Sequence, residues 1–126
     1  MKPLEWLGKT REQLVAFPRD VCRDIGYALH FAQSSDKHPT AKPLKGFVGA
    51  GVLEVVENHE GNTFRAVYTV RFADVVYVLH VFQKKSKRGI ATPRQDLELI
   101  RTRLMDAREH YRRKYQTRAG RVGGDR

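Results

Sequence analysis

The stretch that decides the fold is VYVLHVFQKKSKRGIATPRQDLELI, residues 76–100 of a 126-residue chain. Residues 76–82 are almost wholly apolar, which is typical of a strand in the middle of a sheet. TPRQDLELI restarts a helical period, with Thr92 predicted as its cap and Pro93 in the first helical position. Between strand and helix lies a cluster of four cations: Lys84, Lys85, Lys87 and Arg88. A buried strand therefore ends in positive charge just before a helix starts.

The preceding segment predicts the neighbouring strands. TFRAVYTVRF, residues 63–72, alternates in polarity, and this pattern predicts a half-buried strand whose outer face carries Arg65 and Arg71. VLEVVE, residues 52–57, reads as the strand before it. A tight turn at residues 73–74 would place Arg65 opposite Phe82, close to Lys84.

Helical periods flank these strands. The N-terminal part predicts a short helix that ends before Pro18 and a second helix that starts there. The C-terminal helix shows an apolar stripe made of Leu97, Ile100, Leu104 and Ala107. The order predicts an α+β fold, with a small antiparallel sheet of three to four strands, two N-terminal helices and one C-terminal helix. We expect one domain over residues 1–112 and a basic, flexible tail over residues 113–126.

Charge and cysteine content bound the function. The formal net charge of +10 indicates a polyanionic partner, such as nucleic acid or an acidic protein segment. The single cysteine, Cys22, excludes an internal disulfide framework and favours a cytoplasmic location. No apolar run reaches the roughly 18 residues that span a bilayer, so no membrane partner is expected.

The expected sheet gathers cations at one end. Arg65 would join the cluster of residues 84–88, and Lys42 and Lys45 would approach from the loop before the first strand. Glu57 is expected near Arg65, with few other carboxylates, so the cluster would be suited to binding phosphates. The competing interpretations are structural: a solvated lysine turn, an Arg65–Glu57 ion pair, and His80 as a core histidine.

Motifs for cofactors and metals are missing. The chain has no Walker loop, no zinc-ligand spacing and no Gly-x-Ser-x-Gly elbow. No metal and no cofactor are therefore predicted, and any chemistry would depend mainly on cations.

Four segments precede the closing helix in this order: AKPLKG, VLEVVE, FRAVYTV and VYVLHVFQKKSKRGIATP. Together they resemble the RelE/HigB toxins of type II toxin–antitoxin pairs, in particular the phage-derived HigB-like branch. The resemblance covers roughly residues 4–112 and is most specific over residues 77–93. It implies a metal-independent endoribonuclease that cuts mRNA on the ribosome. It also implies a cognate antitoxin, commonly with a helix-turn-helix DNA-binding domain.

The resemblance also implies roles for residues. Arg65 matches a strand arginine that contacts phosphate, and Lys84 or Lys85 matches a basic residue that stabilises the transition state. His80 is one candidate for the proton acceptor, beside His59, a lysine or ribosomal RNA. The residues expected to bind RNA phosphates are Lys45, Arg71, Lys87 and Arg88. Arg65→Ala and Lys84→Ala/Lys85→Ala are expected to relieve growth arrest with the fold intact.

Two departures from the family pattern stand out. The C-terminal tyrosine that some relatives use as a base has only Tyr111 as a distant substitute. Valines 55 and 56 follow Glu54, where many relatives have Leu-Arg. Two other functions therefore stay open: a gyrase-inhibiting toxin of the ParE type, and a non-catalytic nucleic-acid-binding module.

Overall fold

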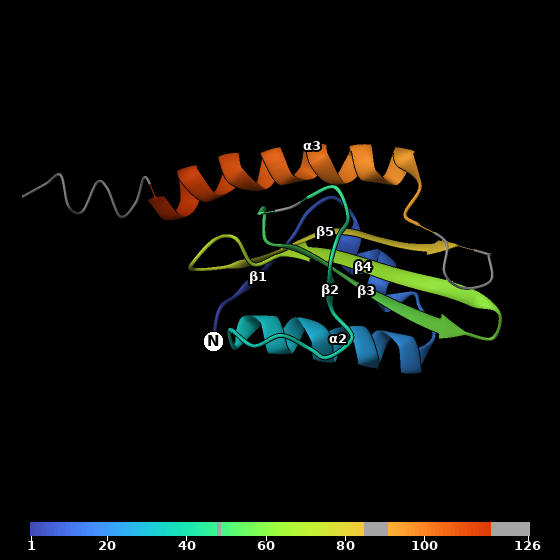
Figure 1. The fold of residues 1–126 in the computed structure, drawn as a ribbon. Coiled ribbons are helices and arrows are strands. Elements are labelled where there is room, and N and C mark those ends of the chain that lie inside the picture. The colour runs from blue at the N-terminus through green and yellow to red at the C-terminus, as the bar shows by residue number, and fades with distance from the viewer. Residues whose placement is uncertain (48, 85–90, 117–126) are drawn as a thin grey trace, which may run out of the picture.

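The computed structural model describes residues 1–47, 49–84 and 91–116 (Figure 1). Within this part of the chain, no helix has the length and apolar character needed to cross a membrane. The elements are, in chain order, β1 (Leu4–Trp6), α1 (Thr10–Val15), α2 (Arg19–Gln33), β2 (Lys42–Pro43), β3 (Val52–His59), β4 (Asn62–Thr69), β5 (Val76–Lys84), α3 (Arg94–Tyr111) and a short π-helical segment (Arg112–Gln116).

The sheet has five strands in the order β1-β5-β4-β3-β2. The α+β class with two N-terminal helices and one C-terminal helix is confirmed. Two short edge strands enlarge the expected sheet, and β1 makes it mixed because it pairs in parallel with β5. Strands of three and two residues are too short to show an alternating pattern, which explains why the sequence signals them poorly.

Helices cover both faces of the sheet, with α3 on one side and α2 on the other (Figure 1). Ile25 and Leu29 of α2 pack with Tyr68 in one core, and Ile100 of α3 packs with Leu79 in the other. The prediction of a solvent-facing side on β4 is therefore wrong. Residues 63–69 of β4 are all buried, because α3 covers the face that carries Arg65.

The β4–β5 register confirms that Arg65 lies opposite Phe82. The tight turn is wrong, since residues 70–75 form a longer connection between these strands. An irregularity between Val67 and Tyr68 leaves Leu79 as an extra residue on β5. This bulge shifts the pairing by one residue. As a result Arg65 pairs with Phe82, which is the same partner that a two-residue turn would have given.

Candidate functional site

An open pocket of about 490 Å³ lies where β2, β3 and β4 meet the start of α3. It brings together cations from distant parts of the sequence: Lys42, Lys45 and Arg65. The remaining lining residues are Pro43, Leu44, Glu54, Val56, Ala91, Thr92 and Leu97. The pocket thus joins two exposed lysines with one recessed guanidinium.

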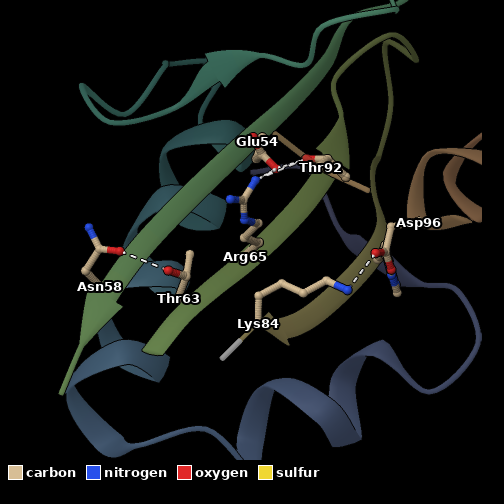
Figure 2. Close-up of polar contacts among 8 residues, drawn as sticks. Glu54, Asn58, Thr63, Arg65, Lys84, Thr92 and Asp96 are labelled. Carbon is tan, nitrogen blue, oxygen red and sulfur yellow. Dashed lines mark hydrogen bonds and ion pairs between the residues drawn. The ribbon is translucent and has the colours of Figure 1, made fainter. Parts of the chain in front are cut away.

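Arg65 lies at the centre of this site and is only 4% exposed (Figure 2). Its Nη1 donates hydrogen bonds to Glu54 Oε2 at 3.3 Å and to Thr92 Oγ1 at 3.2 Å. Thr92 Oγ1 in turn donates to the same Glu54 oxygen at 2.7 Å. Thr92 therefore links the start of α3 to the sheet. The N-cap of α3 is Pro93 and the helix begins at Arg94, so the prediction of Thr92 as the cap is wrong by one residue.

The partner of Arg65 is Glu54, and the expected pairing with Glu57 is wrong. Glu54 lies opposite Val67, on the side of the sheet that α3 covers, whereas Glu57 lies opposite Phe64, whose ring packs in the α2 core. Side chains alternate between the two faces of a strand, so residues 54 and 57 point to opposite sides. Burial and the neighbouring Asp24 carboxyl group raise the pKa of Glu57.

Glu54 is the functional candidate that sequence reasoning missed. Among the described residues, only its Oε2 receives hydrogen bonds, and Oε1 has no donor. The side chain keeps 15% of its surface exposed, so this carboxylate is accessible from the pocket. The signal available in the sequence is a single carboxylate within the apolar run VLEVV.

A second hollow extends the site across β2 and β3. It measures about 340 Å³ and is lined by Pro39 and Thr40 together with three residues of the first pocket: Lys42, Glu54 and Val56. The two hollows therefore adjoin, and Glu54 is one of the residues that line both.

Lys84 and His80 both contact Asp96 at the start of α3. Asp96 Oδ1 lies 2.8 Å from His80 Nε2, and Asp96 Oδ2 lies 3.3 Å from Lys84 Nζ (Figure 2). The His80 ring also stacks on Phe82, with 4.4 Å between the ring centroids. Lys84 and Arg65 thus lie on the same side of the sheet, each next to a carboxylate.

The structure places His80 in the core, as the structural interpretation of this histidine expected, and away from the pocket of Glu54. His80 is 7% exposed and does not line the pocket. Burial lowers its pKa below the ordinary value, although the hydrogen bond to Asp96 opposes this shift. A neutral His80 that donates from Nε2 to Asp96 anchors α3 on β5.

The lowered pKa of His80 predicts a loss of stability in acid. A histidine in the unfolded chain has a pKa of about 6.5. The pKa of His80 is lower in the folded protein, so between these two pKa values the unfolded state binds a proton that the folded state does not. The free energy of unfolding should therefore fall as the pH drops below about 6.5. Urea unfolding at about pH 7.5 and 5.5 should show a larger loss for the wild type than for His80→Gln. The exposed His30→Gln serves as the control, and an equal loss in wild type and His80→Gln would contradict this account.

The expectation of few carboxylates is wrong as well. Glu54 and Asp96 both lie among the cations, and each accepts a contact from one of them. Lys42 and Lys45 differ, since neither has a carboxylate within 4.0 Å in the part of the chain that the structure describes. These two exposed lysines are the cations most available to an anionic ligand.

The other predicted residues do not all meet here. Arg71 lines a different pocket, beside the C-terminal end of α3, which corrects its assignment to this site. Tyr111 lies at that end too and donates a hydrogen bond to Asp74 at 2.7 Å. Lys85, Lys87 and Arg88 lie outside the described residues. No group of three possible metal ligands occurs within the described ranges.

The predicted tail starts with ordered residues. Lys114 and Tyr115 bond to Glu5 Oε2 at 2.8 and 3.0 Å, so the chain stays attached to the sheet as far as the π-helical segment. Burial raises the pKa of Glu5, but the contacts with Lys114 and Tyr115 lower it, and the pKa is lowered overall.

Comparison with known proteins gives one match. The model of the family described as phage-derived protein Gp49-like (DUF891) matches residues 12–105, which span the pocket and most of the chain. No curated protein and no solved structure matches significantly. The match supports the toxin class suggested by the sequence at the level of the family, without singling out the HigB branch. The protein belongs to the phage-derived Gp49-like family.

Proposed function

We propose that this protein is the toxin of a type II toxin–antitoxin pair and cleaves mRNA presented by the ribosome. One observation carries the proposal: Glu54, Arg65 and two exposed lysines line one open pocket. RNA transesterification is promoted by a general base together with fixed positive charge near the phosphate, and a carboxylate beside cations can supply both. The net charge of +10 and membership of a phage-derived family support the same function.

The proposed reaction is attack of a ribose 2′-hydroxyl on the adjacent phosphorus. Glu54 Oε1 takes the proton of the 2′-hydroxyl, the bond from the 2′-oxygen to phosphorus forms, and the bond from phosphorus to the 5′-oxygen breaks. A rim lysine or water returns a proton to the 5′-oxygen. The products are a 2′,3′-cyclic phosphate and a 5′-hydroxyl, and no co-reactant is consumed.

Arg65 has two roles in this scheme. Its guanidinium holds Glu54 in place through Oε2, and it offers fixed positive charge to the phosphate in the transition state. Lys42 and Lys45 neutralise the phosphate as it enters from the rim. The two hollows that Glu54 lines accommodate the nucleotides that flank the scissile bond.

The recessed position of Arg65 supports the proposed dependence on the ribosome. A phosphate reaches a side chain that is 4% exposed only if the RNA strand bends into the pocket. Holding the strand in that geometry reduces the entropy cost of the reaction, and the ribosome would supply this positioning.

Cleavage in a translation reaction tests the proposal. Primer extension should reveal new 5′ ends in a translated mRNA after the protein is added, and the same mRNA should stay intact without ribosomes. A cognate antitoxin, acidic where it covers Lys42 and Lys45, should abolish cleavage. Inhibition of DNA supercoiling with intact mRNA would instead identify a gyrase-directed toxin.

A further inference from the structure

A second cationic pocket lies at the other end of α3. It measures about 450 Å³ and is lined by Arg71, Phe72, Ala73, Arg108, Tyr111, Arg112 and Gln116. Arg71 lies in the β4–β5 connection, two residues after the end of β4. Figure 1 shows this connection beneath the C-terminal part of α3, whereas the lining of the pocket of Glu54 includes residues at the start of α3.

The backbone of Arg71 is held in place by neighbouring residues. Its amide donates to Thr69 Oγ1 at 3.1 Å, and that hydroxyl donates to the carbonyl of Gly51 at 3.0 Å. Gly51 has a φ of +64°, and a Cβ there would lie 3.1 Å from the amide nitrogen of Arg71. Only glycine permits this close approach without strain.

The wall opposite Arg71 is equally fixed. Tyr111 packs on Phe72, with 4.7 Å between the ring centroids, and bonds to Asp74 at 2.7 Å. These contacts fasten the β4–β5 connection to α3. The position of Arg71 relative to Arg108 is therefore set by both layers of the fold.

Arg71 and Arg108 are both exposed, and neither has a carboxylate within 4.0 Å among residues 1–47, 49–84 and 91–116. Arg112 differs because it pairs with Glu109. A basic residue in the last turn of a helix is favoured by the helix dipole, which would account for Arg108 alone. It does not account for Arg71, which comes from the β4–β5 connection and lines the same hollow.

The chemistry of the pocket favours a phosphodiester backbone. Arginine guanidinium groups match phosphate oxygens in geometry, and none of the lining residues is acidic. Phe72 and Tyr111 are at least 90% buried, so their rings are not free to stack on bases. Backbone contact without base contact is the expected mode of binding.

The exposed face of α3 extends this cationic surface. Arg94, Arg101 and Arg108 recur every seven residues, so they lie along one side of the helix. Arg94 pairs with Glu98 at 3.7 Å, as Arg23 of α2 pairs with Asp20 and Asp24. Arg101 and Arg108 are the two arginines of this row without a carboxylate within 4.0 Å among the described residues.

We infer that the Arg71–Arg108 pocket is a second RNA-backbone site, separate from the pocket of Glu54. The inference deepens the proposed function, because it assigns a further contact to the same RNA-directed protein. The backbone belongs either to the mRNA strand or to ribosomal RNA. Both sources offer the same phosphates.

The test compares two double variants of the full chain with equal net charge. Arg71→Gln/Arg108→Gln removes two of the pocket's three arginines and leaves Arg112, which pairs with Glu109. Arg11→Gln/Arg19→Gln removes two exposed arginines of the N-terminal helices. Binding is measured by fluorescence anisotropy with a labelled 12-nucleotide RNA and by co-sedimentation with vacant ribosomes, over a range of salt concentrations.

We expect Arg71→Gln/Arg108→Gln to weaken binding about tenfold in total, because each of the two exposed charge contacts to phosphate contributes roughly threefold. The dependence of log affinity on log salt should also become shallower, by about 1.4 for two lost contacts to single-stranded RNA. The control should change affinity by less than about twofold. Loss in both assays identifies the mRNA strand as the source, and loss with ribosomes alone identifies ribosomal RNA.

Equal affinities of the two double variants in both assays would overturn the inference. Unchanged RNA binding with lost binding of a poly-glutamate peptide would also overturn it, in favour of a protein partner. These measurements do not depend on cleavage. Failure of the proposed nuclease would appear separately, as intact mRNA in the translation reaction.

Discussion

Replacing Glu54 with glutamine should reduce ribosome-dependent mRNA cleavage by about a hundredfold or more, which is the usual contribution of a general base. Glutamine has nearly the same shape and still accepts the hydrogen bond from Thr92, but its amide cannot take the proton of a 2′-hydroxyl. The measurement is the single-turnover rate of cleavage on programmed ribosomes.

Glu57→Gln is the matched control, because residue 57 lies on the same strand and points to the opposite face. Its cleavage rate should stay within about twofold of the wild type. A Glu54→Gln variant that cleaves at the wild-type rate would exclude Glu54 as the base and return the role to another group.

The second large effect concerns stability. Arg65→Ala should lower the free energy of unfolding by about 3 kcal/mol, because the change leaves the largely buried Glu54 carboxylate without its cation. This revises the expectation, based on the sequence alone, that Arg65→Ala leaves the fold intact. Growth arrest relieved by Arg65→Ala would therefore reflect lost folding as much as lost chemistry.

A double-mutant cycle separates these contributions. Glu54→Ala/Arg65→Ala removes both charges and should cost less than the sum of the two single changes, as measured by urea unfolding. Strict additivity would show that the 3.3 Å contact between Arg65 and Glu54 contributes nothing. Arg65→Lys is the better variant for kinetics, because it retains the charge and loses only the planar fork.

The sequence predicts the fold class well because the long elements have strong periods. The stripe of Leu97, Ile100 and Ala107 lies where the helical period places it, facing the sheet. Both cores follow from such stripes together with the apolar run of β5. The edge strands β1 and β2 are set by pairing with β5 and β3, so their two or three residues hold no period of their own.

The candidate site is predicted only in part. Arg65 belongs to the pocket, as expected, because the register of two long strands determines its position. The choice of Glu54 over Glu57 depends on which face α3 covers, and the sequence pattern of a single strand does not specify that. Arg71 lies beyond the end of β4, in the connection to β5, so the alternation along the strand does not place it and it lines a different pocket.

Glu54 and Arg65 are proposed to promote attack by the 2′-hydroxyl of RNA on the adjacent phosphorus. The most direct test uses programmed ribosomes carrying a message with a single 2′-methoxy group at the cleaved nucleotide. We predict that this message stays intact, while the unmodified message yields a 2′,3′-cyclic phosphate and a 5′-hydroxyl. Cleavage of the methoxy message, or products ending in a 3′-hydroxyl and a 5′-phosphate, would contradict the claim.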